Sequence, residues 1–433
     1  MAEFKPVLLS LPTSLTPSLV LEILPYGLTI HKLLVQADGR THDVVIGPES
    51  PKDHVTQKYT NSIVGRYANR IPVGTHVLEK KGFKSELKAL ANESPIVSLH
   101  GGPVGFDAVP WTILTKDNPP KLFSRSELSR LGGLPESSFA IFRLISPAGD
   151  QGFPGELTVE ALIALISPES PTKPITTSGD AEYSLGSVVI VYRAKLEGET
   201  KTVTPVNLTQ HWGFNLDASL QDGPEPLTIK EHTLTIKADH IAELDSSALG
   251  TGNFIAVSTK PAHAHTAKII GDKFPDAGYD DYYLFSESAQ STIETRILLN
   301  SFGEESNYLK DLLRPPDDAE RGTRAGAVVE LKSKKSGLKL AFDTNQRGAM
   351  FYSNALAKAT NGARKKIHGG SGVSGDGNAY GPHTAAFLEF HHPLTAFLYP
   401  KNKDTEDTLL TSDELYHNYV RCDVTLNPPR PEA

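Results

Sequence analysis

The stretch "LTQHWGFNL", residues 208–216, places His211 among residues that favour a β-strand. An imidazole with a reference pKa of about 6.5 can give or take a proton near neutral pH. His211 is therefore either a proton donor in a binding pocket or a core histidine whose nitrogens are satisfied by its neighbours. The choice between these two interpretations depends on the other chemistry-bearing residues of the chain.

Two further segments put polar residues at predicted strand ends. "GRYANRI" (65–71) contains Asn69 and Arg70, and "SLHGGPVGFDAVPW" (98–111) places His100 before two glycines, which allow the backbone to approach a ligand closely. Taken singly these signals are weak, because an arginine at a strand end is usually a surface residue and His-Gly-Gly is usually a turn. Their combination is more specific than either one.

Six segments follow one another in a characteristic order and approximate spacing. They are "GRYANRI", "LHGG" followed by "GFD" and a tryptophan, "GDQGFPGEL" (149–157), "TPVNLTQHWGFNL" (204–216), "GYDDYYLF" (278–285) and "FLEFHHP" (387–393). In these segments the chain resembles the aldose 1-epimerases, also called galactose mutarotases. The resemblance runs from about residue 20 to about residue 425.

The resemblance implies an all-β fold, a large antiparallel β-sandwich of the galactose mutarotase type, with a sugar-binding cleft across one sheet face. It also implies a catalytic role for three residues: His211 as general acid, Glu389 as general base and His100 as a helper near the ring oxygen. Sugar binding is implied for Asn69, Arg70, Asp280 and Gln346, the last in "TNQRGAMFYSN".

The implied reaction interconverts the α and β anomers of a free hexose, D-galactose or D-glucose or both. One carboxylate to take the proton of the C1 hydroxyl and one donor to protonate the ring oxygen are sufficient, so no metal and no cofactor is expected. With reference pKa values of about 4.3 for Glu389 and about 6.5 for His211, catalysis should fall at low pH and again at high pH.

The chain departs from the family pattern beside the ligand-contacting positions. Gln210 and Trp212 stand in "TQHWGFNL" where the family usually has "TNHxYFNL", Asp281 replaces a common histidine, and Arg347 replaces a common proline. These departures leave the acid and the base in place and affect the expected hydroxyl specificity.

Two other functions are compatible with the same fold. A mutarotase for a phosphorylated hexose would need cationic side chains near the cleft, for which Arg347 and the pair Lys365–Lys366 are the only indications. A non-catalytic sugar-binding protein would be expected to lack the acid or the base, whereas this chain has both His211 and Glu389.

Several other motifs are better explained without a ligand. "GSGVSG" (370–375) fits a dinucleotide-binding pattern but is not framed by a strand and a helix, and the pairs His263/His265 and His391/His392 offer no complete metal-ligand set. The short basic runs "KSKKSGLK" and "ARKKIH" fit a hairpin tip and a loop.

The composition favours a small neutral ligand over nucleic acid or an anionic membrane, because the formal charge of -8 provides no basic excess. The single cysteine, Cys422, is typical of a reducing compartment, and no signal peptide or apolar membrane span is predicted, so a cytoplasmic location is expected. The expected partner is the sugar alone, with the protein a monomer or a homodimer.

Strand-like segments dominate the chain. "SVVIVYRAKL" (187–196), "LTIKEHTLTIKADHI" (227–241) and "AVVELKSKKSGLKLAFDT" (327–344) combine β-branched residues with alternation, and the last predicts a hairpin that turns at "SKKSG". The clearest predicted helix is "ESNYLKDLL" (305–313), which ends before Pro315 and Pro316.

The chain is predicted to form a single domain over residues 1–433. Loop insertions, with a few short helices, are predicted near 116–137, 167–186, 286–326 and 361–381. None of these stretches separates regions of different composition, so they are interpreted as surface insertions and not as linkers.

Overall fold

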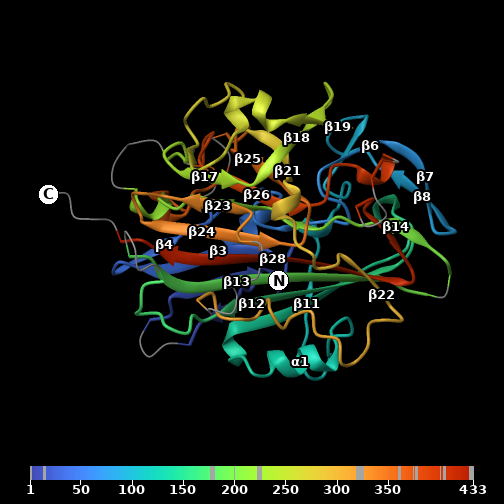
Figure 1. Ribbon diagram of the computed structural model, residues 1–433, viewed down its shortest axis with the longest axis horizontal. Helices are drawn as coiled ribbons and strands as arrows, with labels where there is room; N and C mark the ends of the chain where they lie inside the picture. The colour runs from blue at the N-terminus through green and yellow to red at the C-terminus, as the bar shows by residue number, and fades with distance from the viewer. Residues whose placement is uncertain are drawn as a thin grey trace.

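The computed structural model describes residues 2–12, 16–175, 181–198, 200–221, 227–317, 326–358, 362–373, 375, 379–399, 401–402 and 406–428. Antiparallel strands dominate these residues (Figure 1) and stack in layers, which confirms the prediction of a large antiparallel β-sandwich.

The larger sheet contains the predicted strands at 187–196 and 327–344, whereas the predicted segment 227–241 is divided between this sheet and the smaller one. Its order is β10 (Thr112–Ile113), β11 (Phe139–Ser146), β12 (Leu157–Ile166), β13 (Tyr183–Leu196), β28 (Glu414–Leu426), β24 (Leu338–Thr344), β23 (Val329–Lys332), β17 (Thr233–Ile236) and β20 (Lys268–Ile269), and β22 (Arg296–Leu298) also pairs with β28. The hairpin prediction at "SKKSG" is confirmed, because β23 and β24 pair across it.

A smaller sheet packs against the larger one. Its order is β16 (Trp212–Phe214), β26 (Ala386–His391), β25 (Gly348–Tyr352), β21 (Asp280–Phe285), β18 (Ala238–Leu244) and β19 (Gly250–Ala256). Side chains of both sheets belong to one buried apolar cluster, for example Ile190 and Tyr192 on β13 and Leu388 and Phe390 on β26. This cluster is the core of the sandwich.

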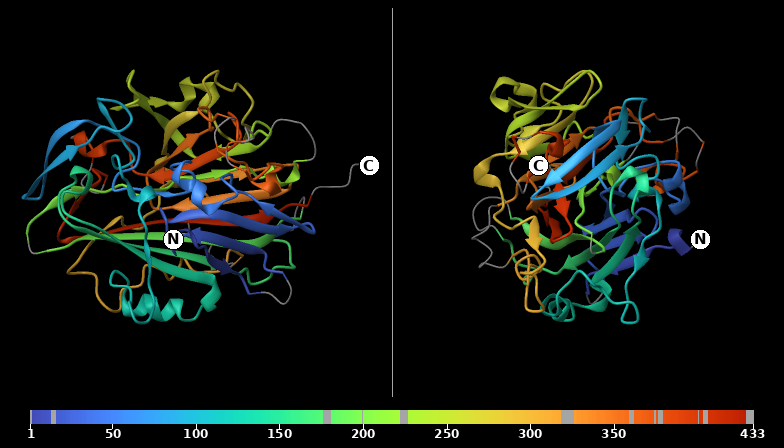
Figure 2. Two further views of the ribbon diagram at one scale, coloured as in Figure 1. Left: turned by 180° about the vertical axis from the view of Figure 1, so that it is seen from behind. Right: turned by 90° about the vertical axis from the view of Figure 1, so that its right-hand side faces the viewer.

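One four-stranded sheet and several two-stranded pairs accompany the two main sheets. An N-terminal sheet has the order β1 (Val7–Ser10), β2 (Leu19–Leu24), β3 (Thr29–Ala37) and β4 (Arg40–Asp43). Two-stranded pairs are formed by β5 (Ile63–Val64) with β15 (Thr209–Gln210), β6 (Arg70–Pro72) with β9 (Val97–Leu99), β7 (Gly74–Lys80) with β8 (Phe83–Ala89), and β14 (Val203–Pro205) with β27 (Leu409–Thr411). The β7–β8 hairpin projects at one end of the molecule (Figure 2).

The predicted helix at 305–313 is wrong, because the structure has turns there. Its leucines Leu309, Leu312 and Leu313 are nevertheless buried against the outer face of the larger sheet, which explains the helix-like apolar pattern. The α-helix of the described residues is α1 (Arg125–Leu131), inside the predicted insertion at 116–137. A capping box of Ser124 and Glu127 starts it, and this signal is visible in the sequence.

Short 3-10 turns lie between the strands. They span Ala2–Phe4, Pro51–Val55, Phe106–Ala108, Glu136–Ser138, Asp150–Gly152, Ala218–Leu220, Val257–Thr259, Pro261–His263, Glu287–Ala289, Lys366–His368 and Ala396–Leu398. No helix among the described residues is long and apolar enough to cross a membrane.

The insertion around α1 is tied to the larger sheet by a buried ion pair. Arg193 on β13 donates to both carboxylate oxygens of Glu127 at 2.7 Å, and both side chains are fully buried. Glu127 also accepts from the main-chain N–H of Tyr308, so it joins two of the predicted insertions. These segments cover the outer face of the sheet, and for this reason β12 is buried at every position.

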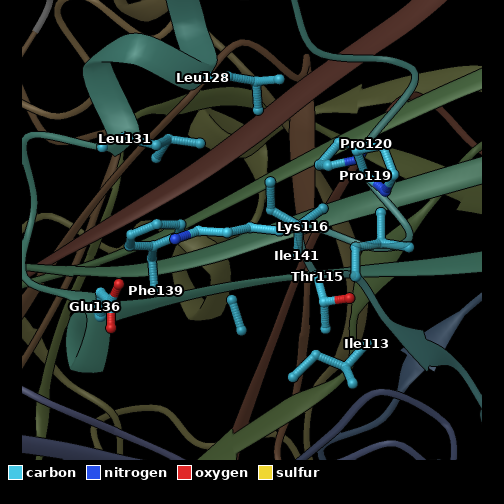
Figure 3. A pocket seen from close by; sticks show the side chains of 13 residues that line it. Ile113, Thr115, Lys116, Pro119, Pro120, Leu128, Leu131, Glu136, Phe139 and Ile141 are labelled. Carbon is cyan, nitrogen blue, oxygen red and sulfur yellow. The ribbon is translucent and has the colours of Figure 1, made fainter.

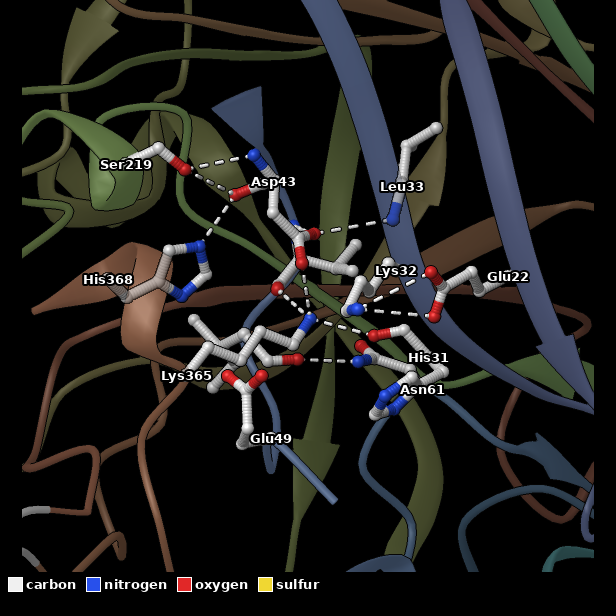
Figure 4. Close-up of polar contacts among 12 residues, drawn as sticks. Glu22, His31, Lys32, Leu33, Asp43, Glu49, Asn61, Ser219, Lys365 and His368 are labelled. Atoms are coloured by element: carbon white, nitrogen blue, oxygen red, sulfur yellow. Dashed lines mark hydrogen bonds and ion pairs between the residues drawn. The ribbon is translucent and has the colours of Figure 1, made fainter. Parts of the chain in front are cut away.

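The segment that begins at residue 362 is tied to the N-terminal sheet by a second buried ion pair (Figure 4). Lys365 Nζ lies 2.7 Å from Asp43 Oδ2 and donates to the main-chain oxygens of His31 and Val45. Since both side chains are fully buried, each charge depends on the other for compensation. Parts of three predicted insertions lie outside the described residues, namely 176–180, 318–325, 361, 374 and 376–378.

Candidate active site

The smaller sheet turns one face to the core and the other to a pocket. Along β26, Leu388 and Phe390 belong to the core cluster, whereas Phe387 and Glu389 line the pocket. This alternation is the period of two that a pleated strand imposes on its side chains. On the neighbouring strands, Tyr352 and Asp280 continue the pocket face, because Asp280 pairs with Tyr352 and Tyr352 pairs with Phe387.

The pocket has a volume of about 320 Å³ and a mainly polar and aromatic lining. The lining residues are Lys58, Tyr59, Thr60, Asn69, Arg70, Glu93, Leu99, His100, His211, Asp280, Tyr352, Asn354, Leu356, Ala357, Phe387 and Glu389. The fold thus brings together all the residues singled out from the sequence except Gln346.

A larger pocket of about 600 Å³ lies between α1 and β11 (Figure 3). Its walls are mainly apolar, with Leu128, Leu131, Phe139 and Ile141 among them, and Lys116 extends across it. It contains none of the acid–base residues predicted from the sequence. The smaller polar pocket is therefore the candidate active site.

His211 and Glu389 face each other because of strand register. Trp212 pairs with Leu388 where β16 runs antiparallel to β26, so the next position along each strand brings His211 opposite Glu389. The distance from His211 Nε2 to Glu389 Oε1 is 3.1 Å. His211 lies between β15 and β16, at the point where the chain passes from one sheet to another.

The two side chains change each other's pKa. Burial alone would lower the pKa of His211, but the charge and hydrogen bond of Glu389 outweigh burial and raise it above its usual value. Burial would raise the pKa of Glu389, but His211 outweighs it and the pKa is lowered to about 2. These opposite pKa shifts favour the charged pair, in which an imidazolium can donate a proton and a carboxylate can accept one.

His100 is placed by a second strand register. Arg70 pairs with Leu99 at the end of β6 and β9, and the adjacent residues Asn69 and His100 lie side by side just beyond this pair. The main-chain N–H of Asn69 donates to His100 Nδ1 at 3.2 Å. This contact assigns the hydrogen of the neutral ring to Nε2. Burial, with the charge of His211, lowers the pKa of His100 to about 3, so the ring is neutral at pH 7.

The glycines after His100 allow a close approach within the protein itself. A Cβ atom at Gly101 would lie 2.1 Å from the main-chain oxygen of Gly65, and the φ angle of Gly101 is +90°. The sequence interpretation assigned this freedom to contact with a ligand. The structure uses it for the packing of the His100 turn against the "GRYANRI" segment.

Arg70 lies between two carboxylates of the pocket lining, those of Glu93 and Asp280. It donates to both oxygens of Glu93, at 2.7 and 2.8 Å, and its Nη1 lies 3.9 Å from Asp280 Oδ2. Burial raises the pKa of Asp280 although Arg70 opposes the effect. Arg70 and Asp280 therefore offer a donor group and an acceptor group within one wall of the pocket.

Gln346 lies in the turn between β24 and β25, outside the pocket lining. Its side chain is fully buried, and neither polar atom of the side-chain amide has a hydrogen-bond partner among the described residues. The structure does not bring Gln346 to His211 and Glu389.

Three aromatic residues complete the pocket and were missed from the sequence. The ring centroid of Tyr59 lies 4.7 Å from that of His100 and 6.4 Å from that of His211, and the ring centroid of Phe387 lies 4.9 Å from that of His211. Phe387 could have been found by counting two residues back from Glu389 along one strand, whereas Tyr352 is placed by the register of β25 with β26. Nothing in the local sequence distinguishes Tyr59.

The ligating atoms of His100, His211 and Glu389 lie within 4.8 Å of one another, which raises the question of a metal ion. A metal-bound histidine normally donates its second ring N–H to an acceptor. The Nδ1 atom of His100 instead faces a main-chain N–H, which places the hydrogen on the pocket-facing nitrogen. This donor set fits proton transfer and hydrogen bonding to a ligand better than metal binding.

Comparison with known proteins gives a consistent result. The family model described as aldose 1-epimerase matches residues 14–169 and 180–380. The chain is 34% identical over 238 residues to a galactose mutarotase from Bos taurus, a match that covers 54% of each chain. It is 31% identical over 281 residues to a galactose mutarotase from Sus scrofa, with 64% of this chain and 67% of the relative covered.

The match to the bovine protein thus spans about half of that protein's length. Among solved structures, an aldose epimerase homologue from C. elegans is similar over 98% of this chain and 100% of its own, with a TM-score of 0.66 and 18% identity. At this identity the structural likeness shows the fold alone.

Proposed function

Because the chain belongs to the aldose 1-epimerase family, we propose that it interconverts the α and β anomers of a free hexose, D-galactose or D-glucose or both, by acid–base ring opening and closure. The observation that carries the proposal is the pair of His211 and Glu389, 3.1 Å apart in a polar pocket of about 320 Å³.

In the proposed reaction Glu389 takes the proton of the C1 hydroxyl while His211 gives its proton to the ring oxygen. The bond between C1 and the ring oxygen breaks, and C1 becomes an aldehyde carbon. After rotation about the C1–C2 bond, the hydroxyl released from the ring attacks the other face of the aldehyde and returns its proton to His211. The new C1 oxygen takes the proton held by Glu389, so both residues end in their starting states.

The surroundings of the pair support this assignment of roles. Glu389 Oε1 contacts His211, and Glu389 Oε2 has no hydrogen-bond partner among the described residues, so one carboxylate oxygen can accept from a sugar hydroxyl. His100 is neutral, and its Nε2–H can donate to the ring oxygen region. Asn69, Arg70 and Asp280 are proposed to bind the remaining hydroxyls.

The phosphorylated-hexose alternative has little support. Arg347 Nε lies 3.0 Å from Glu406, and Lys365 is fully buried with Asp43. None of the three cations indicated by the sequence, Arg347, Lys365 and Lys366, lines the pocket. Lys58 does line it, with its Nζ 4.0 Å from Asp107. Arg70 lines it as well but already donates to both oxygens of Glu93, so the described lining of the pocket lacks the convergent free cations that phosphate recognition normally uses.

The test is polarimetry of freshly dissolved α-D-galactose and α-D-glucose, with the wild type and Glu389→Gln, against the spontaneous rate in the same buffer. An acceleration that disappears in the variant supports the activity and the base together. No acceleration with either sugar would contradict the proposal and favour a non-catalytic sugar-binding protein, which sugar-binding calorimetry would then detect.

A further inference from the structure

His211 occupies a corner of the chain that strand pairing alone does not hold. The residues before it, in β15, pair with β5, and the residues after it, in β16, pair with β26. His211 itself belongs to neither strand. Its main-chain N–H donates to the oxygen of Ser62 and its main-chain oxygen accepts from the N–H of Asn61, so residues 61–62 form the outer support of the corner.

Asn61 uses every polar group it has at this corner. Its main-chain N–H donates to the oxygen of His211 at 2.9 Å, and its Oδ1 accepts from the N–H of Gly213 at 2.8 Å. Its Nδ2 donates to the oxygen of Ile46 at 2.6 Å, and its main-chain oxygen accepts from Gln210 Nε2 at 2.6 Å. Asn61 is fully buried.

The side-chain amide of Asn61 takes the place of a peptide group between β16 and the segment that follows β4. The N–H of Ile46 donates to the oxygen of Gly213, while Asn61 bridges the oxygen of Ile46 and the N–H of Gly213. The adjacent oxygen, that of Val45, accepts from Lys365, so the support reaches a buried ion pair. Gln210, one of the departures from the family pattern, belongs to the same network.

We propose that Asn61 is a positioning residue that holds the main chain on both sides of His211 and thereby sets the contact of His211 with Glu389. The proposal rests on the proposed mutarotase function for its catalytic consequence. Asn61 does not line the pocket and acts through His211. A small displacement of an acid from its substrate can reduce the rate by about 100-fold, which makes main-chain support of this corner important for catalysis.

The test variant is Asn61→Gly. Asn61 has a φ angle of 60°, a left-handed conformation that glycine adopts without strain, so the substitution removes the amide and leaves the backbone conformation accessible. The expected result is a fall in kcat of about tenfold or more, with KM for the sugar changed by less than about threefold, because the substrate-binding wall is untouched.

A second readout does not depend on activity. In protein labelled with 13C-histidine, the NMR titration of His211, assigned by comparison with His211→Gln, reports its contact with Glu389. The pKa of His211 should fall towards the ordinary value in Asn61→Gly, because the stabilising contact is loosened. If the wild type shows no mutarotation, the proposed function fails, and this titration still tests the positioning role.

The matched control is Asn345→Ala. Asn345 is also buried, and its amide also bridges main-chain groups, accepting from Tyr419 N–H at 3.0 Å and donating to the oxygen of His417 at 2.9 Å. Both variants should lose thermal stability, and only Asn61→Gly should shift the His211 titration and kcat. Equal shifts in both variants, or none in a folded Asn61→Gly, would overturn the proposal.

Asn61→Asp covers the case in which Asn61→Gly does not fold. The aspartate keeps an acceptor for the N–H of Gly213 and loses the donor to Ile46, so an intermediate loss of kcat and an intermediate His211 titration are expected. A wild-type titration and kcat in Asn61→Asp, together with an unfolded Asn61→Gly, would reduce Asn61 to a stability role and overturn the proposal.

Discussion

His211 Nε2 lies 3.1 Å from Glu389 Oε1, and the contact joins the residue between the short strands β15 and β16 to the centre of β26. The pair is nearly inaccessible to bulk water, because His211 is 8% exposed and Glu389 is 2% exposed. Charges in such surroundings interact more strongly than they would in water. The predicted activity and its pH dependence both depend on this relationship.

Glu389→Gln should reduce mutarotation by about 10²- to 10⁴-fold, the range typical for loss of a general base. The amide is similar in shape but cannot take the proton of the C1 hydroxyl. Polarimetry with background subtraction measures the change. Glu86→Gln, at an exposed position of β8, is the control and should retain wild-type activity. Retention of activity in Glu389→Gln would contradict the assignment of the base.

The pH dependence of kcat/KM should be asymmetric. Since the pKa of Glu389 is lowered to about 2, the base stays ionised down to about pH 4, and activity should fall only as pH rises through the raised pKa of His211. Ordinary pKa values would instead predict an acid limb near about pH 4.3. The pKa of Asp280 is raised, so protonation of Asp280 is a second source of a fall in kcat/KM at acid pH. A fall in kcat/KM between about pH 4 and about pH 6 that persists in Asp280→Asn would therefore contradict this prediction.

The same pKa shifts predict how the pair contributes to stability. The contribution of His211 is complete below its unfolded-state pKa of about 6.5 and is lost as pH rises through the raised folded-state pKa. The contribution of Glu389 is present above about pH 4.3 and is lost as pH falls towards about 2. The free energy of unfolding, measured with urea, should differ most between wild type and His211→Gln from about pH 4.3 to about pH 6.5. The difference should shrink at lower and at higher pH. A difference that does not change with pH would contradict the prediction.

Arg70→Lys should raise KM more than it lowers kcat. Lysine cannot reproduce the two-pronged contact with Glu93, so the donor that faces the pocket becomes less well placed. Loss of one charge-assisted hydrogen bond of about 1.5–3 kcal/mol corresponds to a KM increase of about tenfold to 100-fold. Steady-state kinetics measures it, with the exposed Arg125→Lys on α1 as control. An unchanged KM would exclude Arg70 from sugar binding.

Lys365→Met should reduce the free energy of unfolding by about 3–5 kcal/mol, because Asp43 would be left as a buried charge without its partner. Chemical denaturation measures the loss. Lys84→Met is the control, since the Lys84–Glu79 pair is exposed and should contribute less than about 1 kcal/mol. A loss below about 1 kcal/mol in Lys365→Met would show that Asp43 is compensated by other groups.

Local sequence patterns were informative where a pattern has one structural meaning. The alternation in 327–344 and the turn residues between its halves predicted the β23–β24 hairpin. The helix prediction at 305–313 failed because its buried leucines fit a helix and also fit a turn that packs against the sheet. The capping box of Ser124 and Glu127 marks the helix that does form, although it was not singled out from the sequence.

The sequence by itself determined the residue types available for acid–base chemistry, the all-β class and the family resemblance, because these depend on local patterns and on the order of motifs. Only the tertiary structure decided that Glu389 lies opposite His211, that Gln346 lies outside the pocket, and that Tyr59 packs against both histidines. The physical reason is that strand register and burial are properties of segments far apart in the chain. They set both the distance between two side chains and the pKa of each, and no local stretch of residues contains that information.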